Sequence, residues 1–351
     1  MYFCTKIGDN QNAQSVINNS MRQKVIILAL VAVAVLAGAA MGAYTYIFLH
    51  KNSAEAEPYS IYVDEDDTAD SICIKSGLGW RFGIYNRVMS FRPRTGHYIV
   101  EPGVRSLELF RKLRNGEQDP VKLTVPSVRT LSRLAAYLGN QLMRDSADFA
   151  TTFAQEAEAM GYTMETLPAL FIPNTYEMYW DVTAKGFMKR MEQENKAFWN
   201  EKREAKARAI GLSHVEVSTL ASIVEEETAN DGEKPMVAGL YINRLRRGML
   251  LQADPTVKFA MQAFGLRRIY NEHLRYESPY NTYLHPGLPP GPIRLPSIVG
   301  LDAVLNYVEH TYIYMCAKED FSGTHNYATT YAEHLRNARR YVQALNNRGI
   351  K

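Results

Sequence analysis

Residues 25–49 read VIILALVAVAVLAGAAMGAYTYIFL, a run without a single charged side chain. As a helix it would be about 37 Å long at about 1.5 Å per residue, enough to cross the hydrocarbon core of a bilayer. The alternative is a cleaved signal peptide, for which Ala37-Gly38-Ala39 could serve as the cleavage site. The apolar region of a signal peptide spans only about 7–15 residues. The run therefore predicts a single uncleaved transmembrane helix.

The charges that flank this run predict its orientation. Lys6, Arg22 and Lys24 precede it, and acidic residues follow it shortly. Basic residues accumulate on the cytoplasmic side of a membrane span. We therefore expect residues 1–24 to be a cytoplasmic tail of a single-pass protein in the inner (cytoplasmic) membrane. The rest of the chain would then be extracytoplasmic, in the periplasm.

Composition excludes several classes of protein. The 351 residues are 46% hydrophobic and 22% charged, ordinary values for a chain that buries a core. A net charge of +3 gives no general attraction to nucleic acid. The three cysteines have no CxxC spacing, and no GxGxxG or P-loop pattern occurs. An extracytoplasmic domain of this kind would act on envelope polymers, peptides or lipids.

Beyond the predicted span, hydrophobic periodicity indicates an α+β fold in two parts. Residues 58–125 predict a small α+β module, and residues 126–351 predict a larger, mostly helical α+β domain. The module is expected to contain strands over residues 59–63, 96–100 and 121–125, with a helix that Ser106 caps and that ends near Gly116.

Three adjacent glutamates end one predicted helix. Ser213 and Glu216 have capping-box spacing, and an apolar stripe follows them. At about 100° per residue, Glu225 and Glu227 border that stripe, whereas Glu226 points away from it toward solvent. A carboxylic acid in a partly apolar setting has a raised pKa and can act as a general acid. Periodicity alone favours the alternative, an acidic surface end of a helix.

A rigid loop follows in the last third of the chain. Residues 278–293 read SPYNTYLHPGLPPGPI and contain five of the 15 prolines. Rigid loops often carry binding groups, although a turn-rich connector is the alternative. The Asn, Tyr and His content favours a site. A lone histidine such as His325 would usually be structural.

Six motifs occur in order along the chain, and together they are specific. They are LASIVEEET (220–228), YINRL (241–245), LQADPTV (251–257), PYNTY (279–283), GLPPGPI (287–293) and GTHNY (323–327). With these motifs the chain resembles the endolytic murein transglycosylase family (MltG, YceG-like), from the apolar run to about Tyr341. Residues 96–116 resemble the LysM-like module of that family.

The resemblance implies a membrane-anchored lytic transglycosylase. Such an enzyme cleaves the MurNAc-β-1,4-GlcNAc bond within a glycan strand, without water, and leaves 1,6-anhydro-MurNAc ends. One glutamate serves first as acid and then as base, and the family position for it is Glu225. Glu227 is expected to support it. The residues expected to bind substrate are Gln252, Asp254, Asn281, Tyr283 and His325.

The resemblance also implies the partners. Peptidoglycan glycan strands would be the substrate, and peptidoglycan synthases in the membrane are candidate partners. No cofactor, metal or nucleic acid is implied. Two other classes stay open at this point. One is a non-catalytic peptidoglycan-binding scaffold, and the other is a glycan hydrolase with Asp254 as its second carboxylate.

Overall fold

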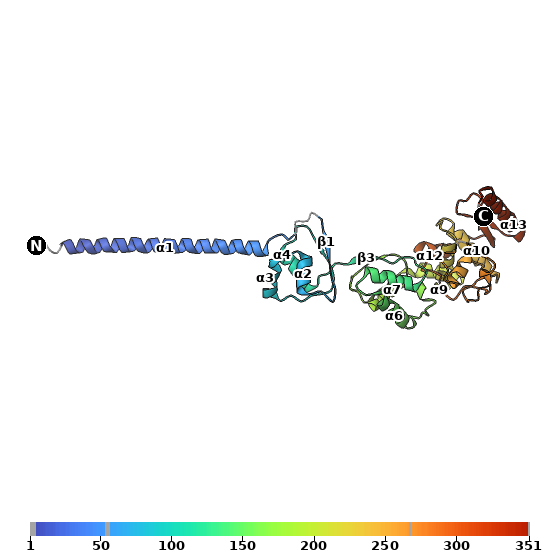
Figure 1. Cartoon of the computed structure of the whole chain (residues 1–351), viewed down its shortest axis with the longest axis horizontal. Helices are drawn as coiled ribbons and strands as arrows, with labels where there is room; N and C mark the ends of the chain where they lie inside the picture. The colour runs from blue at the N-terminus through green and yellow to red at the C-terminus, as the bar shows by residue number, and fades with distance from the viewer. Residues whose placement is uncertain (1–4, 53–56, 267, 350–351) are drawn as a thin grey trace. The chain divides into compact units, whose positions relative to one another are not determined.

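The computed structural model describes residues 5–52, 57–266 and 268–349. It combines helices with short antiparallel strand pairs, so it is a mixed α+β fold, as the sequence predicts. The chain divides into two compact units, Met1–Asp119 and Pro120–Lys351 (Figure 1).

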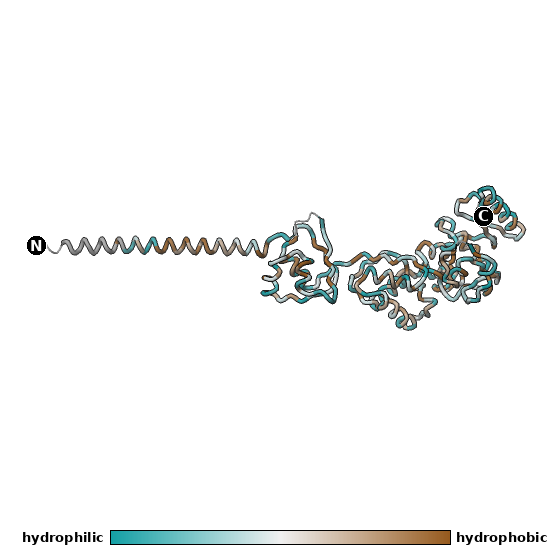
Figure 2. Tube along the Cα trace, viewed as in Figure 1, coloured by the Kyte–Doolittle hydropathy of each residue, from teal (hydrophilic) through white to brown (hydrophobic). Residues whose placement is uncertain are grey.

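The first unit begins with a long helix, α1 (Thr5–Phe48). Its part Asn18–Phe48 is long and apolar enough to cross a membrane. Figure 2 shows hydrophobic residues concentrated in the second half of this helix. The helix therefore contains the predicted span except for its last residue, Leu49, and extends beyond it toward the N-terminus.

The rest of the first unit is a small domain around one core. Strands β1 (Tyr59–Val63) and β2 (Gly96–Val100) pair antiparallel, with Ile61 opposite Tyr98. Between and after them lie α2 (Ala69–Ser76), α3 (Trp80–Met89) and α4 (Ser106–Asn115).

Helix α4 forms where the sequence predicts it, because its apolar residues recur on one face. The prediction that Ser106 caps it is wrong, because Arg105 is the N-cap residue and Ser106 is the first residue of the helix. Leu109, Phe110 and Leu113 on that face are fully buried in the core of the first unit. Gly116 ends the helix at a φ of +72°, a left-handed conformation that favours glycine.

One predicted strand belongs elsewhere. Strand β3 (Val121–Thr124) was expected in the module, but it pairs antiparallel with β4 (Thr175–Met178) in the second unit. Leu123 of β3 is buried in a core of that unit together with Tyr176 of β4. The division between the units therefore falls at Asp119, before this strand.

The second unit contains two hydrophobic cores. The first includes residues of β3 and β4 together with α5 (Leu131–Gln141), α6 (Ser146–Glu156) and α7 (Ala184–Phe198). The second includes residues of α8 (Glu201–Ile210), α9 (His214–Glu227), α10 (Lys234–Arg246) and α12 (Ile298–Leu305).

Further elements complete the second unit. They are α11 (Asp254–Ala260), the antiparallel strands β5 (Tyr314–Ala317) and β6 (His325–Ala328), α13 (Tyr331–Asn347), and the 3-10 turns η1 (Glu158–Met160), η2 (Leu167–Leu170) and η3 (His273–Arg275). Helix α9 lies at the centre of the second core, where every residue from Val217 to Val224 is buried.

Candidate functional site

The capping box that the sequence predicts starts α9. The Ser213 side chain accepts a hydrogen bond from the Glu216 amide, and the Glu216 carboxylate accepts one from the Ser213 amide at 2.8 Å. Other elements surround α9 where it ends. Consequently the three glutamates of its last turn enter three different environments, and none of them is a fully solvated surface residue.

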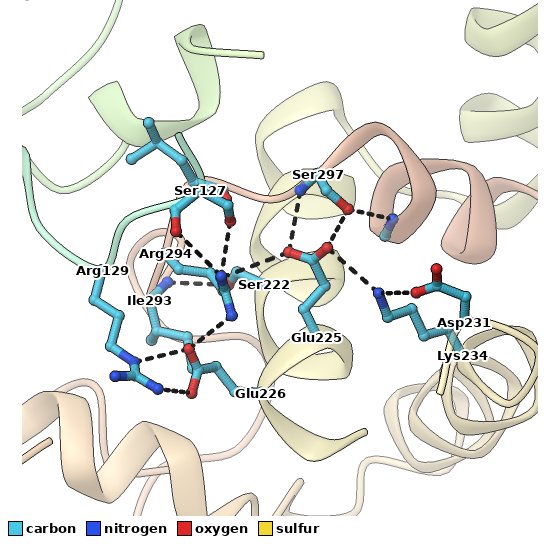
Figure 3. Close-up of polar contacts among 12 residues, drawn as sticks. Ser127, Arg129, Ser222, Glu225, Glu226, Asp231, Lys234, Ile293, Arg294 and Ser297 are labelled. Atoms are coloured by element: carbon cyan, nitrogen blue, oxygen red, sulfur yellow. Dashed lines mark hydrogen bonds and ion pairs between the residues drawn. The ribbon is translucent and has the colours of Figure 1, made fainter. Parts of the chain in front are cut away.

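Glu225 is held by a helix terminus and two cations. Its Oε2 accepts a hydrogen bond at 3.0 Å from the amide of Ser297, which caps α12, and its Oε1 accepts one from the Ser297 hydroxyl (Figure 3). The Lys234 ammonium and the Arg294 guanidinium each lie 3.6 Å from a carboxylate oxygen. Only 6% of the Glu225 side chain is exposed. This carboxylate therefore ties α9 to α10 and to the start of α12.

Glu226 joins α9 to the start of the second unit. Arg129 donates two hydrogen bonds to its carboxylate, each at 2.8 Å, and Arg294 donates a third at 3.0 Å (Figure 3). Its side chain is only 13% exposed. The prediction that Glu226 points to solvent is therefore wrong, because two arginines from distant segments cover it.

Glu227 has a different environment. Its Oε1 accepts a hydrogen bond from the Tyr241 hydroxyl at 2.8 Å. Burial raises the pKa of Glu227 to about 7, and the nearby Asp254 carboxylate acts in the same direction, while the Tyr241 bond opposes them. Burial and Glu227 raise the pKa of Tyr241 far above its ordinary value, so its hydroxyl keeps its proton and donates. At neutral pH Glu227 therefore exists partly as the neutral acid.

A cavity of about 230 Å³ opens beside Glu227. Four of the predicted site residues line it with Glu227, namely Gln252, Asp254, Tyr283 and His325. Glu225 and Glu226 lie outside this cavity. The structure thus brings most of the predicted substrate residues to the second of the two predicted catalytic glutamates.

Two segments that line the cavity, one around Gln252 and Asp254 and one around Tyr283, are hydrogen-bonded to each other. Tyr283 donates a hydrogen bond to Asp254 Oδ1 at 2.6 Å. The Gln252 amide donates to the Thr282 carbonyl at 3.0 Å, and Gln252 has a φ of +47°, in the left-handed region that a side chain disfavours. Gln252 and Asp254, on either side of Ala253, both line the cavity.

Asn281 supports the loop from inside. It is fully buried, and its amide donates to the carbonyls of Leu274 and Tyr276 at 3.0 and 2.9 Å. Its Oδ1 accepts a hydrogen bond from the Tyr283 amide at 3.0 Å. The side-chain amide therefore fixes the segment that carries Tyr283, and binding of substrate by Asn281 stays a prediction.

His325 is held by Glu233, a residue that the sequence analysis did not select. Glu233 accepts hydrogen bonds from the His325 amide at 2.6 Å and from the Tyr327 hydroxyl at 2.9 Å, and His325 Nδ1 lies 3.1 Å from it. The Thr228 hydroxyl donates to it at 2.8 Å. The carboxylate keeps the Nδ1 hydrogen in place, which leaves Nε2 as the second ring nitrogen available to the cavity.

Two more residues that line the cavity were not selected by the sequence analysis, although it quoted the motif that contains them. Tyr241 and Arg244 both belong to the YINRL motif on α10. The buried Arg244 guanidinium donates to the carbonyls of Ile313 and Leu251 at 2.7 and 2.6 Å, so it fixes two segments of the cavity wall. Their three-residue spacing on one helix could have shown that they share a face.

We expect Glu233→Gln to lower the free energy of unfolding by about 1–3 kcal/mol at pH 7, because buried donors lose their charged acceptor. These donors hold the pKa of Glu233 below its ordinary value against the cost of burial. That stabilisation is present above the pKa of the unfolded state and is lost as the pH falls through the folded-state pKa. Urea unfolding should therefore separate the variant from the parent at pH 7, with a smaller gap in acid.

The control for this measurement is Glu192→Gln on α7. Glu192 forms a surface ion pair with Lys196 at 2.6 Å, and such pairs contribute about 0–1 kcal/mol. An equal loss in both variants would contradict the structural role of Glu233.

A model of the YceG-like family matches residues 68–340, which is most of the chain and includes all of the cavity residues. The chain belongs to the YceG-like family. A crystal structure of a yceG-like protein from Listeria monocytogenes shares this fold, with a TM-score of 0.54 and 24% identity over 80% of this chain and 99% of that chain.

Curated relatives of this YceG-like chain are named endolytic murein transglycosylase. One from Streptococcus pneumoniae is 27% identical over an alignment of 313 positions, which covers 78% of this chain and 56% of the relative. One from Bacillus subtilis is 26% identical and covers 78% of this chain and 80% of the relative. The chain thus spans just over half the length of the pneumococcal relative.

Proposed function

We propose that this YceG-like chain is an endolytic lytic transglycosylase, a lyase that acts on the glycan strands of peptidoglycan. The observation that carries this proposal is Glu227, a carboxylic acid with a pKa of about 7 in a polar cavity. A group that must give and then take a proton works best when its pKa lies near the working pH. The names of the relatives supply the substrate class.

The proposed reaction needs one acid that becomes a base. Neutral Glu227 donates its proton to the glycosidic oxygen while the bond from that oxygen to C1 of MurNAc breaks. The resulting carboxylate then accepts the proton of the MurNAc 6-hydroxyl, whose oxygen bonds to C1. The proton returns to Glu227 and no water is consumed, so the product is a 1,6-anhydro end.

Neighbouring groups support Glu227 in this role. The Tyr241 hydroxyl donates to Oε1, which leaves Oε2 for the transferable proton. Asp254 lines the same cavity, and a carboxylate there would stabilise positive charge that develops at C1. Tyr283, Gln252 and His325 offer an aromatic ring and hydrogen-bonding groups to the sugar. The sequence prediction of Glu225 as the acid remains as the competing assignment.

Asp254 also favours a second candidate function. Glu227 and Asp254 both line the cavity. Most glycan hydrolases use two such carboxyl groups, one as the general acid and one as the nucleophile or base. Mass spectrometry of products from purified glycan strands separates the functions. Anhydro-MurNAc ends support the transglycosylase, reducing ends would support the hydrolase, and an absence of products would support a non-catalytic scaffold.

The pH dependence tests the state of Glu227. Because the acid must start protonated, kcat/KM should fall as the pH rises above about 7. This fall on the alkaline side of the pH profile, its alkaline limb, should shift to lower pH in Asp254→Asn, because that change removes a carboxylate that raises the pKa of Glu227. It should shift to higher pH in Tyr241→Phe, because that change removes a hydrogen bond that lowers the pKa. Initial rates on glycan strands from acid to alkaline pH measure both shifts.

The outcome that would contradict this account is a limb that moves in the same direction in both variants, or in neither. A parent limb far from neutral pH would also remove Glu227 from the role.

The location of the enzyme is part of the proposal. We propose that α1 is a single-pass anchor in the inner membrane, with its N-terminus in the cytoplasm and both folded units in the periplasm. The small unit would hold glycan as a LysM-like module, and synthases of peptidoglycan would be its neighbours in the membrane. Protease digestion of sealed spheroplasts should remove the folded units and spare the N-terminus.

A further inference from the structure

The end of α1 is fastened to the small domain by direct contacts. The side chain of Phe48 packs against the core of that domain. Tyr85 of α3 donates a hydrogen bond to the Ile47 carbonyl, and the Ser106 amide donates one to the His50 carbonyl at 2.9 Å. The domain is therefore held at the end of the helix and is not free to move away on a linker.

An aromatic cluster joins α3 to the last turns of α1. The rings of Tyr46 and Trp80 stack with their centroids 6.0 Å apart. The Arg81 guanidinium lies 5.0 Å from the centre of the Tyr46 ring and 4.7 Å from that of Trp80. Figure 1 shows α3 beside the end of α1. If α1 spans a bilayer, its last turns lie at the membrane boundary, so Trp80 lies there too.

Helix α3 exposes two large apolar side chains beside the end of α1. Trp80 is 52% exposed and Val88 is 70% exposed, while Phe82 and Tyr85 on the other side are buried. Trp80 and Val88 lie on the side of the helix turned away from Phe82 and Tyr85, and Ile84 between them is partly buried against the core of the small domain. Scattered apolar residues are common on surfaces, but here they lie on a helix that is attached to a membrane span.

We propose that α3 lies in the headgroup layer of the bilayer that α1 spans, as a second, interfacial membrane contact. Trp80 would sit among the interfacial aromatic residues of α1, a position that Trp and Tyr favour. Val88 would contact the upper acyl chains, and Arg81 and Arg87 would face lipid phosphates. The occupant of this surface is the phospholipid itself. The contact rests on the proposed span and does not depend on the enzymatic activity.

The contact has a consequence for the proposed enzyme. A helix that only spans the membrane can rotate and tilt, whereas a second contact fixes which side of the small domain faces the lipid.

Depth-dependent quenching of Trp80 fluorescence tests the contact. The full chain is reconstituted into phosphatidylcholine vesicles that carry a nitroxide on the headgroup, at carbon 5 or at carbon 12 of the acyl chain. Subtraction of the Trp80→Phe variant isolates Trp80 from Trp180 and Trp199. We expect the headgroup and carbon 5 labels to quench Trp80 most. Quenching by aqueous iodide alone, or mainly by carbon 12, would overturn the proposal.

Two matched variants sharpen the test. Val88→Asp should reduce quenching by lipid, because it places a charge at the acyl boundary. Val342→Asp makes the same substitution at an exposed valine of α13 in the second unit and should leave quenching unchanged. Equal effects of the two variants would reject the proposal.

A separate measurement distinguishes the anchor from the contact. If the chain is released from vesicles by alkaline carbonate, α1 does not span, and both ideas are rejected. A chain that resists release and shows no lipid quenching of Trp80 rejects the α3 contact alone. Glycan cleavage, measured on the same samples, reports the enzymatic proposal independently.

Discussion

Glu227→Gln should reduce turnover of glycan strands by about 10²–10⁴-fold, the usual contribution of general acid–base catalysis. Glutamine keeps the size of the side chain and still accepts the Tyr241 hydrogen bond, but it can neither give nor take the proton. The fold should survive, because above pH 7 the parent carries an ionised carboxylate that its surroundings disfavour. Release of anhydro-ended fragments, with circular dichroism as the control for folding, measures the effect.

The same change, which lowers turnover, should raise the stability of the fold at alkaline pH. The raised pKa of Glu227 means that stability is lost as the pH rises from the pKa of the unfolded chain to about 7. Glu227→Gln removes this loss, so the variant should unfold at a higher temperature than the parent at pH 8 and at the same temperature at pH 4. A variant that is inactive because it is misfolded would not show this gain.

Glu225→Gln and Glu204→Gln complete the comparison. If Glu225 were the acid, a folded Glu225→Gln would be as inactive as the proposal expects of Glu227→Gln. Glu204 forms a surface ion pair on α8, at 3.3 Å from Arg208, and its replacement should change neither activity nor fold. Near-normal turnover of a folded Glu227→Gln would return the role to Glu225.

Sequence reasoning identified the helix that carries the site, and periodicity narrowed the choice to two of its glutamates. Periodicity alone could not choose between them, because the choice depends on what surrounds each carboxylate. The family resemblance implied Glu225. Ser297, which holds Glu225, lies 72 residues away along the chain. Tyr241, which holds Glu227, comes from the next helix. Local pattern contains no information about such contacts until the fold is known.

The boundary of the small domain was misjudged for the same reason. Residues 121–125 look like a strand, and β3 forms there, but a strand does not indicate its partner. Its partner β4 begins at Thr175, after two helices that belong to the second unit. By contrast, the capping box at Ser213 and the glycine end at Gly116 depend only on near neighbours, and both were predicted correctly.

Glu225→Ala should lower the free energy of unfolding by about 3 kcal/mol, the lower end of the 3–5 kcal/mol range for breaking a buried ion pair. The change leaves the Ser297 amide without its acceptor and removes one counter-charge from the buried Lys234. The lower end applies because Lys234 keeps Asp231 at 2.6 Å and Arg294 keeps Glu226 at 3.0 Å. Urea unfolding at neutral pH measures the loss.

A double-mutant cycle assigns this loss to the contacts that carry it. Lys234→Met removes the cation, so Glu225→Ala should cost less in that background than in the parent, and the difference is the coupling of the pair. The folded fraction of Glu225→Ala should keep the alkaline limb of the pH profile near 7, because Glu227 and its cavity are intact. A Glu225→Ala variant as stable as the parent but without activity would show instead that Glu225 acts on the substrate and not as a tie between α9, α10 and α12.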